Sequence, residues 1–315
     1  MKLGIRVATA TLGAVIVAAC VNADRATGTH EHDGTPVSLD YRYNDPARVD
    51  TGGGRLPDLV VDEQATAQHW VVREEKLPAE FCSVQEGGVT PGLRRLIRFT
   101  VTTPNIGDAD VFVGSPLEHA DPNGDGDFSD NDGMFEFASC HAHFHFQNYA
   151  VYRLIDVKTG KVWRSAKKGF CMLDTDPNPA STYSGEAPAG DRNYLNCGSL
   201  TRDGFQGVSH GWADTYVFQL AGQYFILDGG DGQPVVPPGD YYIEVTVNPG
   251  YPPAKKGGCR LAQDPRTGLC HNFAEKSYAN NSMRTKITIS DHSGRGAQGP
   301  EKDSKVYDYE VMKGM

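Results

Sequence analysis

Three histidines at alternate positions are the residues of this chain best suited to chemistry. They are His141, His143 and His145, in the stretch SCHAHFHF. In an extended backbone alternate side chains point to the same side, so the imidazoles would project together while the apolar residues between them pack the other way. Imidazole triads suit zinc, copper, iron or nickel, and leave positions on the ion open for water, oxygen or substrate. The spacing predicts a metal centre; the plainer interpretations are a histidine-rich surface strand or a pH-sensitive patch.

A second set of possible ligands lies in the acidic loop DPNGDGDFSDND at residues 121–132. Gly126 occupies the sixth position, as in an EF-hand-type calcium loop, where a tight turn lets hard oxygens converge on one ion. The final residue is Asp rather than the usual Glu. The pattern predicts a calcium site, with a solvated acidic turn as the alternative. The candidate ligands are Asp121, Asn123, Asp125, Asp127, Ser129 and Asp132.

The segments that must position these ligands have the pattern of short strands. Ile97, Phe99 and Val101 alternate with polar residues, as do the apolar residues of 241–247. The histidine strand is expected to continue through residues 149–154. With 36 glycines and 19 prolines between such runs, the chain has strands joined by turn-rich connections. We predict an all-β fold with a β-sandwich-like core, long loops and little helix, stabilised by disulfides and metals.

The N-terminus has the pattern of an export signal. Lys2 and Arg6 precede an apolar run that ends in Val17-Ala18-Ala19-Cys20, too short for a permanent membrane span. The small residues before Cys20 resemble a bacterial lipobox, which implies lipidation of that cysteine and a membrane anchor. We therefore expect an extracytoplasmic, lipid-anchored protein at the cell surface, with simple secretion as the alternative.

The composition along the chain predicts four segments. We expect a signal peptide at 1–19, a lipid-anchored flexible linker at 20–54, one folded domain at 55–290 and a polar tail at 291–315.

Six cysteines follow Cys20, and export would allow them to form disulfides in any of about fifteen pairings. The formal net charge of −10 argues against a nucleic-acid partner and would attract cationic substrates.

Six ordered stretches resemble the catalytic domain of the lysyl oxidases, copper amine oxidases with a lysine tyrosylquinone cofactor. The similarity runs from about residue 56 to 289. The stretches are LPDLV at 56–60, SCHAHFH at 139–145, KKGFCMLDT at 167–175, QGVSHGWADTY at 206–216, PGDYYIEVTVNP at 238–249 and YANN at 278–281. The resemblance implies that 55–290 is a catalytic domain and that the three histidines bind copper.

The resemblance also implies where the cofactor forms. Tyr216 falls where the family has its quinone-forming tyrosine, and Lys167 where it has the cross-linking lysine. Lys168 is adjacent, so a slip of one residue would transfer that role. Asp214 would share a strand face with Tyr216 and could serve as general base. The implied activity is oxidative deamination of primary amines, including lysine side chains of proteins, to aldehydes with release of ammonia and hydrogen peroxide.

A family calcium site joining the first segment to the last is implied as well. Its matching positions are Asp58, the Leu59 carbonyl, Glu275, Asn280 and Asn281. Ser277 stands where the family has a further aspartate, so the site would be weaker.

The cysteines match the family only in part. Cys140 and Cys197 occupy positions that are paired in the family. Cys82 and Cys171 match family cysteines whose partners are missing here, so those two are expected to pair with each other. A third bridge, between Cys259 and Cys270, would close a local loop.

Two other functional classes remain open at this stage. One is a surface protein that binds copper and calcium without catalysis, which would keep the histidines and form no quinone. The other is a different metalloenzyme on the same triad, such as an iron oxygenase.

Overall fold

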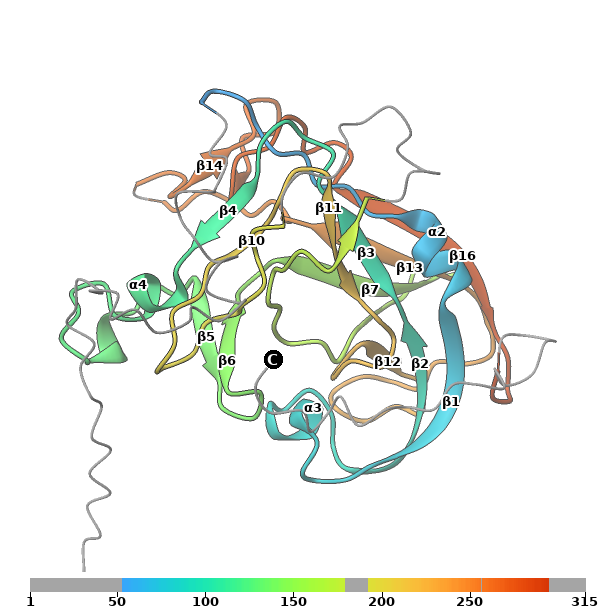
Figure 1. The fold of residues 1–315 in the computed structure, drawn as a ribbon. Coiled ribbons are helices and arrows are strands. Elements are labelled where there is room, and N and C mark those ends of the chain that lie inside the picture. Colours follow the sequence, from blue (N-terminus) through green and yellow to red (C-terminus); the bar gives the residue numbers. More distant parts are fainter. Residues whose placement is uncertain (1–52, 179–191, 256, 295–315) are drawn as a thin grey trace, which may run out of the picture. The chain divides into compact units, whose positions relative to one another are not determined.

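The computed structural model describes residues 53–178, 192–255 and 257–294 (Figure 1). The predicted signal peptide, Cys20, nearly all of the predicted linker and most of the predicted tail lie outside these ranges. No helix within the described ranges is long and apolar enough to cross a membrane.

Strands dominate the described residues, and the helices are short, which confirms the predicted all-β class. Asp62 begins the first described helix, because its carboxylate accepts hydrogen bonds from the backbone N–H groups of Gln64 and Ala65. The helical elements are α2 (Glu63–Gln68), α3 (Cys82–Gln85), α4 (Pro116–Ala120) and the 3₁₀ turn η2 (Phe128–Asp130).

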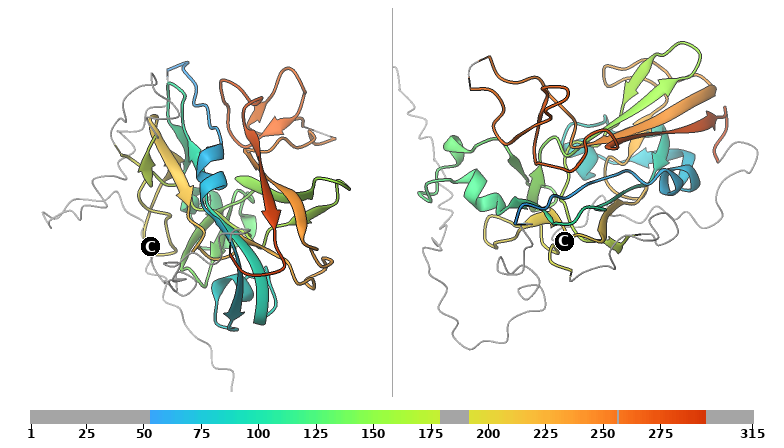
Figure 2. Two further views of the ribbon diagram at one scale, coloured as in Figure 1. Left: turned by 90° about the vertical axis from the view of Figure 1, so that its right-hand side faces the viewer. Right: turned by 90° about the horizontal axis from the view of Figure 1, so that it is seen from above.

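The largest sheet has four antiparallel strands in the order β16-β13-β7-β8. Their bounds are Ser282–Ile289, Gly239–Val247, Ala150–Asp156 and Val162–Arg164. Along β13 the alternate residues Tyr241, Ile243, Val245 and Val247 are fully buried, as the sequence alternation predicts. The side-by-side strands can be followed in Figure 2.

The other strands form small antiparallel sheets. One three-stranded sheet consists of β1 (Trp70–Leu77), β2 (Gly92–Phe99) and β12 (Tyr224–Ile226). A second consists of β3 (Val101–Pro104), β11 (Trp212–Tyr216) and β9 (Asp176–Pro177). Three are pairs: β4 (Val111–Gly114) with β10 (Gln206–Val208), β5 (Phe135–Ala138) with β6 (His143–Phe146), and β14 (Ala262–Gln263) with β15 (Cys270–His271). One large apolar cluster draws residues from most of these sheets.

The histidine segment differs from the predicted single strand. β5 and β6 form a hairpin in which Ala138 pairs with His143, and residues 139–142 make the turn. Only His143 and His145 therefore lie on a strand, while His141 lies in the turn. Another turn follows Phe146, and the chain then enters β7 in a different sheet.

Three disulfides form among the described residues, and two of the predicted pairings are wrong. Cys82 pairs with Cys140, and Cys171 pairs with Cys197, so neither Cys140–Cys197 nor Cys82–Cys171 exists. The reason is proximity: α3 packs next to the hairpin turn, which leaves the α-carbons of Cys82 and Cys140 5.4 Å apart, within bridging distance. The predicted local bridge between Cys259 and Cys270 is confirmed.

Candidate metal and cofactor centre

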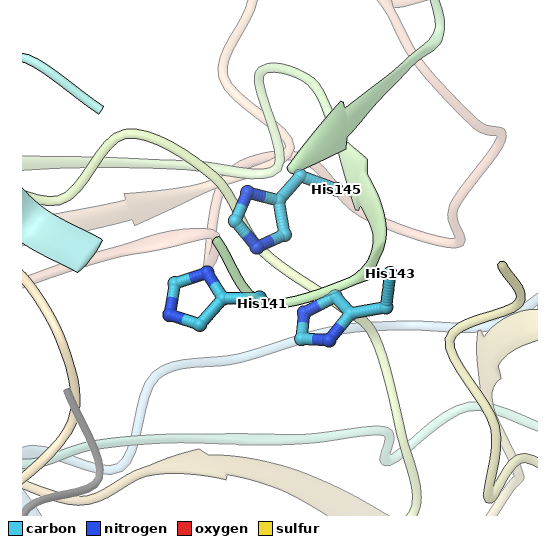
Figure 3. A group of neighbouring side chains, drawn as sticks. All are labelled: His141, His143 and His145. Carbon is cyan, nitrogen blue, oxygen red and sulfur yellow. The ribbon is translucent and has the colours of Figure 1, made fainter. Parts of the chain in front are cut away.

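The three histidines converge despite the turn between them. Their ring centroids are 5.0 to 5.3 Å apart, and one ligand atom from each lies within 4.8 Å of the others. Figure 3 shows a nitrogen of each ring turned toward the space that the rings share. Ala142 makes this possible, because its φ of 58° folds the turn so that His141 faces the strand histidines. The predicted triad is therefore assembled by a hairpin rather than by strand alternation alone.

Burial keeps the strand histidines in the form that binds metals. Burial lowers the pKa of His143 to about 4, and electrostatic interactions with His141 and Lys167 act in the same direction. Burial lowers the pKa of His145 to about 2, again with the help of Lys167. Both rings are neutral at pH 7, and a neutral imidazole has a lone pair to donate. The buried Nδ1 atoms of His141 and His143 make no hydrogen bond, as suits a site for a metal.

The chain following Lys167 packs directly against the triad. A side chain at Gly169 would place its β-carbon 2.1 Å from His145 Nδ1, so only glycine fits there. The next residue, Phe170, accepts a hydrogen bond from the Phe146 N–H at 2.6 Å. These contacts fix the strand histidines relative to the segment that carries Lys167.

A buried glutamine ties the histidine strand to the Cys171–Cys197 disulfide. Gln206 Nε2 donates to the carbonyl oxygens of Phe144 and Cys197 at 2.8 and 2.9 Å. Its Oε1 accepts from the Met172 N–H at 3.1 Å. Gln206 is fully buried, so this amide holds three segments that are distant in sequence.

A carboxylate that the sequence analysis did not single out lies beside one histidine of the triad. Glu86, at the C-terminal end of α3, lies with Oε1 2.8 Å from His141 Nδ1. Neither atom makes a hydrogen bond, because the short contact is not aligned with the ring N–H direction. No sequence signal identifies Glu86, since its place beside His141 depends on the Cys82–Cys140 bridge.

Lys167 and Tyr216 lie together, although 49 residues separate them. Lys167 Nζ is 5.2 Å from the centroid of the Tyr216 ring and donates a hydrogen bond to the Ala221 carbonyl at 3.3 Å. The Tyr216 hydroxyl donates to the Cys171 carbonyl at 2.8 Å, which fixes the ring. Lys168 is exposed. Of the two adjacent lysines, Lys167 is the one beside the ring.

Asp214 lies next to this pair in a buried position. It is 1% exposed, and its Oδ2 makes no hydrogen bond. Burial raises the pKa of Asp214 well above its ordinary value. Burial and the neighbouring Asp214 also raise the pKa of Tyr216 well above 10. The carboxyl group is thus a stronger base than an exposed aspartate.

The segments of the predicted family calcium site also meet. Glu275 accepts hydrogen bonds from the Leu59 N–H at 2.6 Å and from Asn281 Nδ2 at 2.8 Å, and Asn280 Nδ2 donates to Asp58 Oδ1 at 3.1 Å. The Oδ1 atoms of Asn280 and Asn281 are buried and accept no hydrogen bond. Two unsatisfied oxygens beside two buried carboxylates suit a hard cation. Leu59 contacts this cluster through its N–H, whereas the prediction concerned its carbonyl.

The acidic loop at 121–132 is arranged differently. Asp121 accepts from the N–H groups of Asp125 and Gly126, as in a tight calcium-loop turn. Its last residue, Asp132, is engaged elsewhere: Oδ2 lies 2.5 Å from both His119 Nδ1 and Arg260 Nη2. Among the described residues, the histidine triad is the one group of three or more His, Cys, Asp or Glu donors found within 4.8 Å of each other.

Fold and site together define a disulfide-bonded, mostly β domain built around a three-histidine centre with a lysine–tyrosine pair next to it. The family model described as Lysyl oxidase matches residues 59–256. Because this match covers more than half of the chain, the chain belongs to the lysyl oxidase family.

Individual relatives are distant and much longer. The chain is 26% identical over 277 residues to lysyl oxidase homolog 2 of Gallus gallus, covering 80% of this chain and 29% of that protein. It is 26% identical over 267 residues to lysyl oxidase homolog 4 of Homo sapiens, covering 76% of this chain and 31% of that protein. The matches therefore span less than a third of these relatives.

Proposed function

We propose that this chain is a copper-dependent primary-amine oxidase. It would convert a primary amine, oxygen and water into an aldehyde, ammonia and hydrogen peroxide. The observation that carries this proposal is the position of Lys167 Nζ, 5.2 Å from the Tyr216 ring centroid, in a chain of the lysyl oxidase family. A lysine tyrosylquinone cofactor requires this juxtaposition of an amine and a phenol.

His141, His143 and His145 would hold the copper ion. Their convergence and the neutral state of the strand histidines support this assignment. Bound there, copper would supply, with oxygen, the oxidation of Tyr216 to a quinone joined to Lys167, and this cofactor would be the electron sink for the substrate amine.

The surrounding side chains would orient the ring and move a proton. The hydrogen bond to the Cys171 carbonyl holds the Tyr216 ring before oxidation, and its burial excludes water from it. The unpaired Asp214 Oδ2 would accept the α-proton of the bound amine. Burial raises the pKa of Asp214, so its ionised carboxylate would be a stronger base than that of an exposed aspartate.

The substrate class is primary amines, including lysine side chains of proteins. The formal net charge of −10 favours approach of cationic amines. It does so equally for a free amine and for a lysine on a protein surface.

We place this activity outside the cytoplasm. Three disulfides within the described residues fit an oxidising compartment. Export by residues 1–19, anchoring through a lipidated Cys20, a linker at 20–54, a catalytic domain at 55–290 and a tail at 291–315 complete the proposed organisation.

Calcium would stabilise the domain at the cluster of Asp58, Leu59, Glu275, Asn280 and Asn281. The buried unsatisfied asparagine oxygens support this site. A second, weaker calcium site is proposed in the acidic loop at 121–132, where Arg260 would compete for Asp132.

The experiment is quinone detection on exported, copper-loaded protein. We expect a coloured phenylhydrazine adduct in the wild type and none in Tyr216→Phe, with unchanged copper content in both. Tyr251→Phe, a change at a partly exposed tyrosine, is the matched control and should keep the adduct. A wild-type protein that binds copper but forms no adduct would contradict the oxidase and favour a copper-binding surface protein.

A further inference from the structure

Arg98 is a fully buried arginine whose guanidinium links strand β1 to the turn that follows β11. Its Nε donates to both oxygens of the Glu75 carboxylate at 3.0 and 3.1 Å, and its Nη2 donates to Oε2 at 2.8 Å. Its Nη1 donates to the carbonyl oxygens of Phe218 and Leu220 at 3.1 and 3.3 Å. A buried charge is costly unless it is paired and hydrogen-bonded, and these contacts meet that need.

The turn at 217–222 begins directly after Tyr216 and leads into β12, which lies beside β2 in the same sheet (Figure 1). Besides its contacts with Arg98, the turn has a second attachment, because the Phe218 N–H donates to Thr100 Oγ1 at 3.1 Å. Arg98 and Thr100 are two residues apart in sequence. One short segment therefore holds the turn.

The same turn holds Lys167. The Ala221 carbonyl accepts a hydrogen bond from Lys167 Nζ at 3.3 Å. Gly222 has a φ of +68°, and a β-carbon there would lie 3.0 Å from the α-carbon of Lys167. The Ala166 N–H donates to the Tyr224 carbonyl at 2.9 Å, just beyond the turn. Both the backbone and the amine of Lys167 are thus placed by the turn.

We propose that Arg98 is a positioning residue for cofactor formation. By holding the turn at 217–222, it keeps the Ala221 carbonyl where Lys167 Nζ lies 5.2 Å from the centroid of the Tyr216 ring. This inference rests on the proposed function, in which the amine adds to the oxidised ring. Such a step needs close approach, and a misplacement of about 1 Å costs about 100-fold in rate.

Two variants loosen the turn in different ways. Arg98→Lys keeps the positive charge but loses the planar set of donors that reaches two carbonyl groups. Thr100→Val has nearly the same shape, changes no charge and removes the acceptor of the Phe218 N–H. Thr285→Val is the matched control, because it removes a buried hydroxyl from β16 without touching the turn. Thermal melting of each copper-free variant reports the general loss of stability.

The first measurement is acetylation of lysines in the copper-free protein, read by mass spectrometry. Lys167 should react about fivefold faster in Arg98→Lys and in Thr100→Val, as loss of one net hydrogen bond predicts. Lys168 is exposed and adjacent, so it serves as the internal reference and should react equally in all proteins. Thr285→Val should label as the wild type does, even if it melts at a lower temperature.

The second measurement is the rate at which copper-loaded protein forms the cross-link between Lys167 and Tyr216. Both turn variants should form it at least about tenfold more slowly than the wild type. Their Cu(II) affinity should stay at the wild-type value, and so should turnover per molecule of quinone once it has formed. Unchanged turnover per quinone separates a role in assembly from general damage to the site.

Three outcomes would overturn the inference. In the first, Lys167 is acetylated at the wild-type rate in both turn variants. In the second, its acetylation rises but the cross-link forms at the wild-type rate. In the third, cross-linking and Cu(II) affinity fall together. If acetylation rises as expected but the copper-loaded wild type forms no cross-link, the hold of Arg98 on Lys167 stands and the proposed function fails.

Discussion

The backbone of Gly169 lies directly against the ring of His145. A β-carbon at this position would come within 2.1 Å of His145 Nδ1 and 2.4 Å of its Cγ. The segment carrying Lys167 and the strand carrying His145 therefore approach as closely as they do because residue 169 has no side chain.

Replacing Gly169 by Ala should displace His145 and weaken copper binding. We expect Cu(II) affinity to fall about 10- to 100-fold, the range seen when a supporting contact of a metal ligand is lost. Chelator competition measures it. Lys168→Ala, at the exposed neighbour, is the control, and equal affinities for the two variants would contradict the role of Gly169.

Removing the disulfide that closes the longest loop should have a larger effect than removing the one that closes the shortest. Chain-entropy loss predicts that removing Cys82–Cys140, which closes 58 residues, costs about 4 kcal/mol. Removing Cys259–Cys270, which closes 11, should cost about 3 kcal/mol. Urea unfolding of the paired Cys→Ala variants measures both. Of these two variants, only the one without Cys82–Cys140 should also lose copper affinity, because that disulfide anchors the turn that carries His141. Weaker copper binding in the variant without Cys259–Cys270 would contradict this role.

Glu275 should make the calcium-free protein less stable as pH rises. Burial raises the pKa of Glu275 from an ordinary 4.5 to about 7. Between these values the folded state holds a proton that the unfolded state has released, so the free energy of unfolding falls with increasing pH, by about 3 kcal/mol in total. Unfolding in a calcium chelator at pH 4.5 to 8 tests this.

In Glu275→Gln the fall in the free energy of unfolding with increasing pH should be smaller by about 3 kcal/mol. Calcium binds the ionised carboxylate, so it should raise the wild-type melting temperature at pH 8 and have little effect on Glu275→Gln. A wild-type protein whose stability stays level or rises from pH 4.5 to 7 would contradict the raised pKa.

Asp214→Asn should impair turnover without impairing assembly. If Asp214 Oδ2 removes the α-proton, kcat with a primary amine should fall about 10²- to 10⁴-fold. Copper content and phenylhydrazine reactivity should remain. Asp176→Asn, at an exposed position on the adjacent strand β9, should keep full activity. An Asp214→Asn enzyme with normal kcat would assign the base elsewhere.

The sequence predicted the strands and the histidine cluster, because alternation of apolar residues reports burial directly. Tyr241, Ile243, Val245 and Val247 are buried as that pattern requires. Convergence of the histidines was also predicted, although the geometry that produces it was not. Ala142 has a left-handed backbone conformation. Alanine rarely adopts this conformation, so the sequence gives no sign of it.

The pairing of the cysteines and the place of Glu86 could not be read from the sequence. Both depend on α3 packing against the turn between β5 and β6, and neither segment has a pattern that identifies the other. The approach of Lys167 to Tyr216 is likewise tertiary, and it was expected only because the surrounding motifs resemble a family in which such a pair reacts.

The most direct test of the proposed oxidase activity is peptide mapping of copper-loaded protein by mass spectrometry. We predict one cross-linked species that contains Lys167 and Tyr216, absent from the copper-free protein and from Tyr216→Phe. Recovery of both peptides unmodified from protein with bound copper, or a cross-link through Lys168, would contradict the central claim.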